Sequence, residues 1–150
     1  MNIAVLKYNG LFMLKIDFTT TPNEKFSTEM NQGLMACLER LTGFIGGPKM
    51  HTIYAQENQK TIGGIVGYFH EDTLWIDSIY INKSRRKQGL GKMLVEQITI
   101  YAKNCKTSEI QLNTYFPEAH QFFAHQGFET VVSIPKWKYG LTCYLMKKTI

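Results

Sequence analysis

The chain lacks any apolar run approaching the roughly 18 residues that a membrane-spanning helix needs. Residues 1–7 have too short an apolar stretch for a signal peptide, and no small-residue cleavage pattern follows them. We therefore expect a cytoplasmic protein with no membrane partner. A length of 150 residues with a hydrophobic fraction of 44% predicts one ordinary domain over residues 1–150 that can bury a core of its own.

Cysteine is also scarce, and no metal site is predicted. Cys37, Cys105 and Cys143 form no Cys-x-x-Cys pair, and each falls at an apolar position of an expected helix or strand. This pattern predicts buried thiols in a reducing compartment rather than a disulfide framework. His120 and His125 lie five residues apart on an expected helix, so they do not share one face and make a poor pair of metal ligands.

Two common nucleotide-binding motifs are missing. No glycine-bearing turn ends in the Gly-Lys-Ser/Thr that a P-loop needs for the terminal phosphate and magnesium. No Gly-x-Gly-x-x-Gly is followed by an acidic residue about twenty positions later, which excludes a typical Rossmann dinucleotide site. The net charge is +5, but the basic residues form no long stripe with interleaved aromatic residues, so a nucleic-acid partner is not expected.

What the chain does have is a basic, glycine-bearing loop, Ser-Arg-Arg-Lys-Gln-Gly-Leu-Gly-Lys, at residues 84–92. Before it, residues 74–81 are rich in β-branched and aromatic side chains and predict a strand. After it, apolar residues recur every three or four positions over residues 89–105 and predict an amphipathic helix. Free N–H groups at a helix start, close-approaching glycine backbone and basic side chains together favour a polyanionic ligand.

Residues 86–91, Arg-Lys-Gln-Gly-Leu-Gly, match the (Arg/Gln)-x-x-Gly-x-(Gly/Ala) pyrophosphate loop of the GNAT acetyltransferases, and the chain resembles that family. Residues 116–128 look like the family's second signature, in which a short helix ends in a glycine followed by an aromatic residue. The two matches cover roughly half of the chain in the family's order. The resemblance implies acetyl-coenzyme A (acetyl-CoA) as cosubstrate, without a metal, and an amine acceptor of unidentified type.

The resemblance also implies how the coenzyme is held. In this family two parallel strands splay apart, and the pantetheine arm of the coenzyme lies in the gap like an extra strand, an arrangement that main-chain hydrogen bonds favour. The residues expected to bind the coenzyme are Ile79, Tyr80, Ile81, Arg86, Lys87, Gln88, Gly89, Leu90, Gly91, Lys92 and Phe122.

The order of elements predicts a mixed α/β (α+β) fold: a central, mostly antiparallel, twisted sheet with two parallel strands, flanked by about three to four helices. Residues 11–19 predict a first strand, and Thr21 to Glu24 a capping box with proline at the first helical position. A hairpin is expected around residues 57–59, and residues 108–115 should pair in parallel with residues 74–81.

The last part of the chain predicts two strands, at residues 128–134 and 139–147, joined by a loop that holds Pro135 and Trp137. The resemblance places this loop beside the acceptor site, where Trp137 and Tyr139 either form a wall for an ammonium substrate or pack as ordinary aromatics. Pairing through a sheet edge into a homodimer is plausible for the family.

Asp77 is the leading candidate for the general base, because it lies in an otherwise apolar strand where desolvation should raise its pKa. A base matters because a primary amine of pKa ~10.4 is only about one part in a thousand free at neutral pH, a handicap of roughly 4 kcal/mol. A structural carboxylate that only makes hydrogen bonds is the equally open alternative for Asp77.

The chain departs from the family pattern at the general acid. Many members carry a tyrosine four residues after the helix alanine, and counting from Ala119 this chain has Phe123 there. The family's asparagine three residues before that alanine is replaced by Phe116. Tyr115 is the candidate substitute acid, with a role in lining the pocket equally open. The alternatives to an active N-acetyltransferase are therefore a coenzyme-binding protein with weakened catalysis and a basic interaction module.

Overall fold

The structure is a computed structural model that describes residues 4–8, 12–16, 21, 23–43 and 49–150 of the chain. The chain divides into two compact units, Met1–Gly47 and Pro48–Ile150.

The first unit holds a hairpin and one helix. Strand β1 (Ala4–Tyr8) pairs antiparallel with β2 (Phe12–Ile16), and α1 (Glu24–Thr42) follows. Strand β2 confirms the described part of the strand that we predicted over residues 11–19, whereas β1 was not predicted.

Helix α1 begins later than the predicted capping box. Its N-cap is Asn23, whose side-chain oxygen accepts a hydrogen bond from the Phe26 N–H at 3.2 Å. The prediction of a capping box starting at Thr21 was therefore wrong, because an asparagine side chain one turn ahead of Phe26 satisfies the free backbone donor instead. Gly43 ends the helix in the left-handed region, with φ of 71°, and its N–H donates to the Glu39 carbonyl at 2.8 Å.

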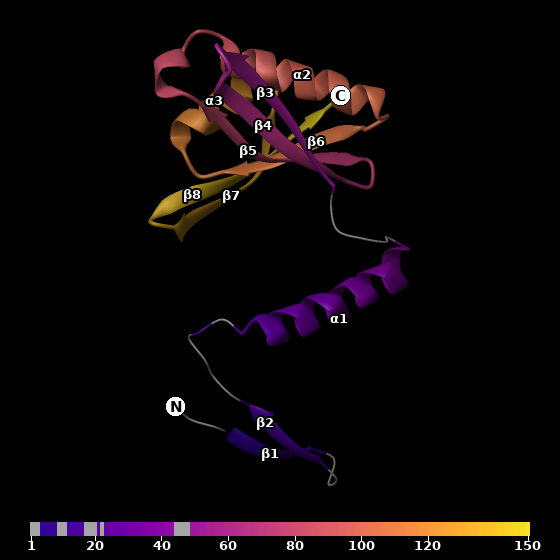
Figure 1. The fold of residues 1–150 in the computed structure, drawn as a ribbon. Coiled ribbons are helices and arrows are strands. Elements are labelled where there is room, and N and C mark those ends of the chain that lie inside the picture. The colour runs from indigo at the N-terminus through magenta and orange to yellow at the C-terminus, as the bar shows by residue number, and fades with distance from the viewer. Residues whose placement is uncertain (1–3, 9–11, 17–20, 22, 44–48) are drawn as a thin grey trace. The chain divides into compact units, whose positions relative to one another are not determined.

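The second unit is a six-stranded sheet with the strand order β3-β4-β5-β6-β8-β7 (Figure 1). Neighbouring strands are antiparallel except for β5 and β6, which are parallel, so the predicted mixed sheet is confirmed. The strands are β3 (Met50–Glu57), β4 (Lys60–His70), β5 (Thr73–Ile81), β6 (Glu109–Thr114), β7 (Glu129–Lys138) and β8 (Leu141–Thr149). The helices are η1, a 3-10 turn (Lys83–Arg85), α2 (Leu90–Asn104) and α3 (Pro117–His125).

A tight turn closes the hairpin of β3 and β4, and in the last hairpin, of β7 and β8, the first strand is longer than predicted. Asn58 and Gln59 join β3 to β4 with φ of 47° and 64°, because a two-residue hairpin turn needs positive φ to match the right-handed twist of its strands. The predicted hairpin is therefore confirmed. The predicted loop around Pro135 and Trp137 is wrong, because β7 runs on to Lys138. A register shift within β7 accommodates this stretch, in which proline donates no backbone hydrogen bond.

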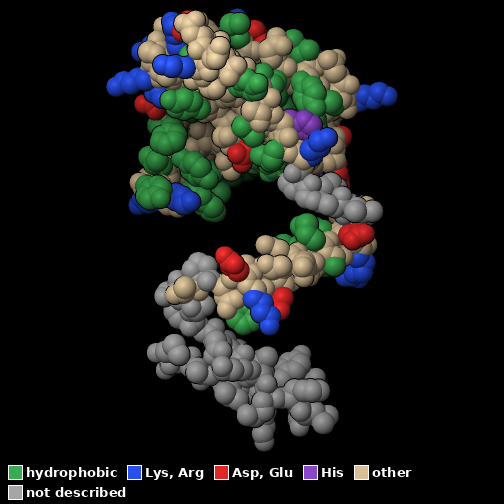
Figure 2. All heavy atoms as spheres, in the orientation of Figure 1, with side chains coloured by type: hydrophobic (Ala, Val, Ile, Leu, Met, Phe, Trp, Pro, Cys, Tyr) green, Lys and Arg blue, Asp and Glu red, His purple; other side chains and the backbone are tan. Residues whose placement is uncertain are grey.

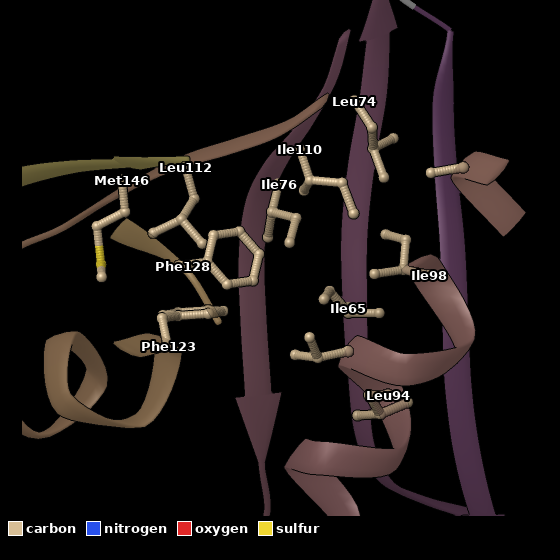
Figure 3. Close-up of a cluster of buried hydrophobic side chains, with 12 residues drawn as sticks. Ile65, Leu74, Ile76, Leu94, Ile98, Ile110, Leu112, Phe123, Phe128 and Met146 are labelled. Atoms are coloured by element: carbon tan, nitrogen blue, oxygen red, sulfur yellow. The ribbon is translucent and has the colours of Figure 1, made fainter. Parts of the chain in front are cut away.

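The core lies on one face of this sheet. Burial alternates along β4, where Ile65 is fully buried, since successive side chains of a strand point to opposite faces. Helices α2 and α3 contribute to the same cluster (Figure 3). Its buried members are Ile65, Leu74, Ile76, Leu94, Val95, Ile98, Ala102, Ile110, Leu112, Phe123, Phe128 and Met146. Both helices therefore cover the same face of the sheet.

None of the helices in the described ranges is long and apolar enough to cross a membrane.

Two isoleucines of α2 test this packing. Ile98 is 1% exposed and Ile100 is 51% exposed, so Ile98→Ala should lower the free energy of unfolding by about 2–5 kcal/mol through lost burial and a residual cavity. Ile100→Ala, the same change two residues away, should alter it by less than about 1 kcal/mol. Urea denaturation of the two variants and the wild type measures both values, and equal losses would contradict the orientation of α2.

Candidate functional site

The site begins where the parallel pair of strands separates. Strands β5 and β6 are paired from Thr73 with Glu109 to Ile76 with Leu112, and β5 then runs on to Ile81 without β6 as a partner. The separation coincides with an irregularity in the pairing of β5 with β4. Ile76 pairs with Gly67 and Ser78 with Val66, which leaves Asp77 as the extra residue of a β-bulge. The two parallel strands thus splay, as the family resemblance implied.

The basic loop follows β5 and is held by its own side chains. The Asn82 side-chain oxygen accepts hydrogen bonds from the Ser84 N–H at 3.1 Å and the Ser84 hydroxyl at 3.0 Å, which closes η1. The Arg86 Nε donates to the Ile81 carbonyl at 3.1 Å, and the Gln88 Nε2 donates to the Ser84 carbonyl at 2.9 Å. These bonds fix the loop as it turns from strand to helix.

Helix α2 starts at this loop with free backbone donors. Gly89 occupies its N-cap with φ of 86°, a conformation that glycine adopts without steric cost, and no side chain caps the helix. Helix α3 also starts without a side-chain cap, after Phe116 and with Pro117 at its first turn. Uncapped N–H groups and the positive end of the helix dipole favour an anion at such positions.

A cleft of about 640 Å³ joins these parts. Its walls come from the splayed end of β5, from the basic loop with the start of α2, and from the first turns of α3. It is lined by Ile79, Tyr80, Ile81, Arg85, Arg86, Lys87, Gly89, Gly91, Lys92, Glu118, Ala119 and Phe122. This volume falls in the range of sites that bind cofactors and other small molecules.

The cleft is strongly basic at the loop. Its lining includes Arg85, Arg86, Lys87 and Lys92, and Figure 2 shows Lys and Arg side chains gathered at the end of this unit where the loop between β5 and α2 lies. Arg85 forms an ion pair with Glu57, and Lys92 is 3.7 Å from a Glu96 oxygen. Both pairs are exposed, so they orient the cations more than they neutralise the field of the cleft. The arrangement suits a ligand with several phosphate charges.

The sequence profile of the acetyltransferase (GNAT) family matches residues 15–128. The chain belongs to the GNAT acetyltransferase family.

Individual acetyltransferases resemble the chain over most of its length. Blasticidin-S acetyltransferase of Streptomyces morookaense is 27% identical over 97 residues, which are 63% of this chain and 70% of that protein. An Agrobacterium tumefaciens structure described as an acetyltransferase has a TM-score of 0.82 at 16% identity, covering 91% of this chain and all 100% of the other. The Agrobacterium tumefaciens match shows that the two chains share the same overall fold.

A third relative was solved with the coenzyme. The Bacillus anthracis protein, described as a streptothricin acetyltransferase in complex with acetyl coenzyme A, has a TM-score of 0.63 at 22% identity. The match covers 72% of this chain and 66% of that one.

The cleft of about 640 Å³ is lined by most of the residues that we predicted to bind the coenzyme. The predicted coenzyme-binding residues that line it are Ile79, Tyr80, Ile81, Arg86, Lys87, Gly89, Gly91, Lys92 and Phe122. Gln88 and Leu90 instead line a separate hollow of about 240 Å³ with Glu57 and Arg85. Arg85, Glu118 and Ala119 were not among the predicted site residues. Glu118 carried a signal, since it precedes Phe122 by four residues and so shares its face of α3.

The predicted catalytic residues lie at the splay rather than in the lining of the cleft. Asp77 follows the last paired residue of β5 and is exposed. The sequence predicted that Asp77 lies buried in an apolar segment, and that prediction is wrong, because the bulge turns its side chain to the surface. Tyr115 follows the end of β6 and is half-buried. Both residues thus border the gap, one from each strand.

Phe123 lies in the core. It is 3% exposed, with its ring centroid 5.3 Å from that of Phe128 and 5.1 Å from that of Phe122. Phe122 is the neighbour that lines the cleft. A hydroxyl-free ring at this position is therefore well packed, and it offers no proton to a ligand.

The β7–β8 hairpin reaches past the carboxyl end of β6. Thr114, the last residue of β6, pairs with Tyr144, and β8 extends beyond that pair to Leu141. Trp137 on β7 is 55% exposed, and Tyr139 in the turn is 91% exposed. Figure 2 shows apolar side chains gathered over this end of the unit. Hence the aromatic pair lies toward the same end of the sheet as the splay.

Shifted pKa values occur outside the cleft. A hydrogen bond from the Gln111 side chain, aided by Lys147, lowers the pKa of Glu109. Desolvation, and after it the neighbouring Cys105 side chain, raise the pKa of Tyr101. Among the residues that the structure describes, no group of three or more His, Cys, Asp or Glu side chains is placed to hold a metal ion.

Two glycines of the loop serve different purposes, which alanine substitutions separate. Gly89→Ala should cost about 1–2 kcal/mol of stability, because φ of 86° is strained for alanine although nothing lies within 4 Å of the added Cβ. In Gly91→Ala the added Cβ would lie 3.2 Å from the Phe122 Cζ, so the cost comes from crowding. Urea denaturation of each variant measures both costs.

The control is Phe122→Leu, which shortens the crowding side chain. We expect it to recover stability in the Gly91→Ala background and to recover none in the Gly89→Ala background. Equal behaviour of the two double variants would contradict the separate roles.

Proposed function

We propose that this protein transfers the acetyl group of acetyl-CoA to a primary amine of a small-molecule or protein acceptor, by direct attack in a ternary complex. The observation that carries the proposal is the basic cleft, which joins the splayed edge of β5 to the uncapped start of α2. A coenzyme with phosphates at one end and an amide-bearing arm at the other matches both parts of the cleft.

The coenzyme fits the cleft in one direction. Its pyrophosphate would lie at Gly89 and Gly91, where α2 offers backbone N–H groups and where Arg86 and Lys87 add positive charge. Its pantetheine arm would lie along residues 79–81, whose edge has no strand partner on the β6 side of the described sheet. The thioester then ends near the splay, between the strands.

The reaction needs a free amine. The free nitrogen attacks the thioester carbon, a C–N bond forms, the C–S bond breaks, and the proton left on the nitrogen after attack passes to solvent. Before that attack, the ammonium form of the amine must lose a proton to a base. We assign this proton to Asp77, directly or through a water, because Asp77 borders the gap at the bulge and is open to solvent.

The leaving thiolate is the second proton site. A free thiol has a pKa of about 8.5, so a thiolate leaves without large cost even when no acid protonates it. Tyr115 is the proposed acid, since it follows β6 at the opposite side of the gap from Asp77. This role replaces the tyrosine for which the chain has Phe123.

A coenzyme-binding protein with weakened catalysis is the second candidate function. The supporting observation is Phe123, an apolar core residue at the position where many family members carry the acid. Measuring acetylated product against a panel of amines distinguishes the two, because binding without product on any amine favours the second candidate.

The acceptor is proposed to be a small molecule that carries a primary amine. The name of the Streptomyces morookaense relative supports a small-molecule acceptor. A wall of Trp137 and Tyr139 would suit a cationic one, since both are exposed toward the end of the sheet where the strands splay. One domain over residues 1–150, a homodimer through a sheet edge and a cytoplasmic location stay predictions.

Calorimetric titration of acetyl-CoA tests the cleft. We expect micromolar binding to the wild type and its loss in the Arg86→Ala, Gly89→Glu double variant, because the variant removes a cation from the loop and puts a carboxylate at the helix start. The control is Lys136→Ala with Lys138→Ala, which lowers the net charge by the same amount on β7 and should keep the affinity. A folded wild type that binds no acetyl-CoA would refute the proposal and favour a basic interaction module.

The pH dependence of turnover tests Asp77. We expect Asp77→Asn to lower kcat/KM about a hundred-fold near neutral pH and to leave acetyl-CoA affinity unchanged. The deficit should shrink as the pH approaches the pKa of the amine, because the free amine then forms without a base. Mass spectrometry of the acetylated amine follows the rate.

Two further variants interpret that result. Glu71→Gln, a change at the exposed β4–β5 turn, is the matched control and should turn over like the wild type. Tyr115→Phe should lower kcat while the KM for acetyl-CoA stays constant. If Asp77→Asn has the same kcat/KM as the wild type at every pH, then Asp77 is not the general base.

A further inference from the structure

Glu118 is the acidic residue in a cleft whose other charged lining residues are all basic. It lies in the first turn of α3, and its side chain is exposed. Among the described residues no hydrogen bond or ion pair holds its carboxylate. The carboxylate is therefore free to contact whatever fills the cleft.

The position of Glu118 along the cleft follows from α3. Phe122 lines the same cleft one turn later, and its ring is the side chain that a Cβ on Gly91 would meet at 3.2 Å. Phe122 thus marks the phosphate end of the cleft. Glu118 lies one turn nearer to the start of α3, which follows the end of β6 at the splay. Its carboxylate accordingly lies part-way between the loop and the gap.

A carboxylate at this point has a definite chemistry. Beside a phosphate it would repel the ligand, whereas beside an N–H or O–H group it accepts a strong hydrogen bond. The pantetheine arm carries amide N–H groups and a hydroxyl, and residues 79–81 of β5 line the same cleft as Glu118.

We propose that Glu118 accepts a hydrogen bond from an N–H or O–H donor of the pantetheine arm within the cleft. This inference rests on the proposed function, because it requires that the cleft binds acetyl-CoA. Glu118 then serves as a selectivity residue, since it attracts the arm while it repels polyanions whose phosphates extend beyond the basic loop. Such selectivity would let a strongly basic cleft reject ligands that carry charge but no arm.

The test compares two ligands by calorimetric titration. Acetyl-CoA contains the arm, and 3′-phospho-ADP is the same nucleotide without it. Glu118→Ala should weaken acetyl-CoA binding about ten-fold, which corresponds to one charge-assisted hydrogen bond. The same variant should bind 3′-phospho-ADP as tightly as the wild type or more tightly, because a negative charge has left the cleft.

Two variants serve as controls. Glu118→Gln keeps an acceptor oxygen without the charge, so it should retain part of the acetyl-CoA affinity that Glu118→Ala loses. Glu96→Gln removes the same charge from the exposed partner of Lys92, outside the lining of the cleft. It reports the effect of the altered field alone, and it should not reproduce the loss that is specific to acetyl-CoA.

The possible outcomes are distinct. Unchanged or tighter acetyl-CoA binding by Glu118→Ala overturns the proposal, and so does an equal loss for both ligands, since the contact would then lie on the nucleotide. A folded wild type that binds neither ligand refutes the proposed function itself. A ten-fold loss confined to acetyl-CoA, with thermal unfolding unchanged, establishes the contact.

Discussion

The structure of the site depends on the end of one backbone ladder, the four parallel pairs that join β5 to β6 up to Ile76 and Leu112. Up to that point the strands share hydrogen bonds and bury Leu74, Ile76, Ile110 and Leu112 in one core. Beyond it β5 stays paired with β4 alone, and β6 continues to Thr114 paired with β8 alone, before α3 begins. The core fixes the strands, and the strands fix where the gap opens.

Helices α2 and α3 both begin near that gap, because each of them follows one of the two separating strands. Helix α2 follows β5 through the basic loop, and α3 follows β6 directly, so each helix begins where its strand leaves the sheet. Both helices then pack on the same face, through Ile98 and Phe123 among others. Because the core sets the helix axes, the free N–H groups at their starts are positioned without any ligand. The site is a by-product of packing at the sheet.

The sequence predicted this region well because its signals are local. A run of β-branched residues, a basic loop with glycine at the left-handed position and a helical period follow one another without a gap, and the structure keeps that order. The exposure of Asp77 could not be predicted from sequence, because it depends on a bulge that is defined by the register of β4 against β5. Glu118 shares a face of α3 with Phe122, but it was missed because only the three-dimensional cleft shows that this face lines the same space as the basic loop. The continuation of β7 through Pro135 likewise needed its partner strand β8, which no local pattern reveals.

The incomplete pairing of β5 also gives the strand two kinds of backbone amide. Between residues 77 and 81, the N–H groups directed to β4 are held in a ladder, and those directed to the β6 side face the cleft with no strand to receive them. The first kind exchanges with solvent deuterium only when the sheet opens, and the second exchanges from the native state. An extended ligand that takes the place of the missing strand would slow the second kind alone. The amide exchange rates of individual β5 residues therefore report whether a ligand fills the gap.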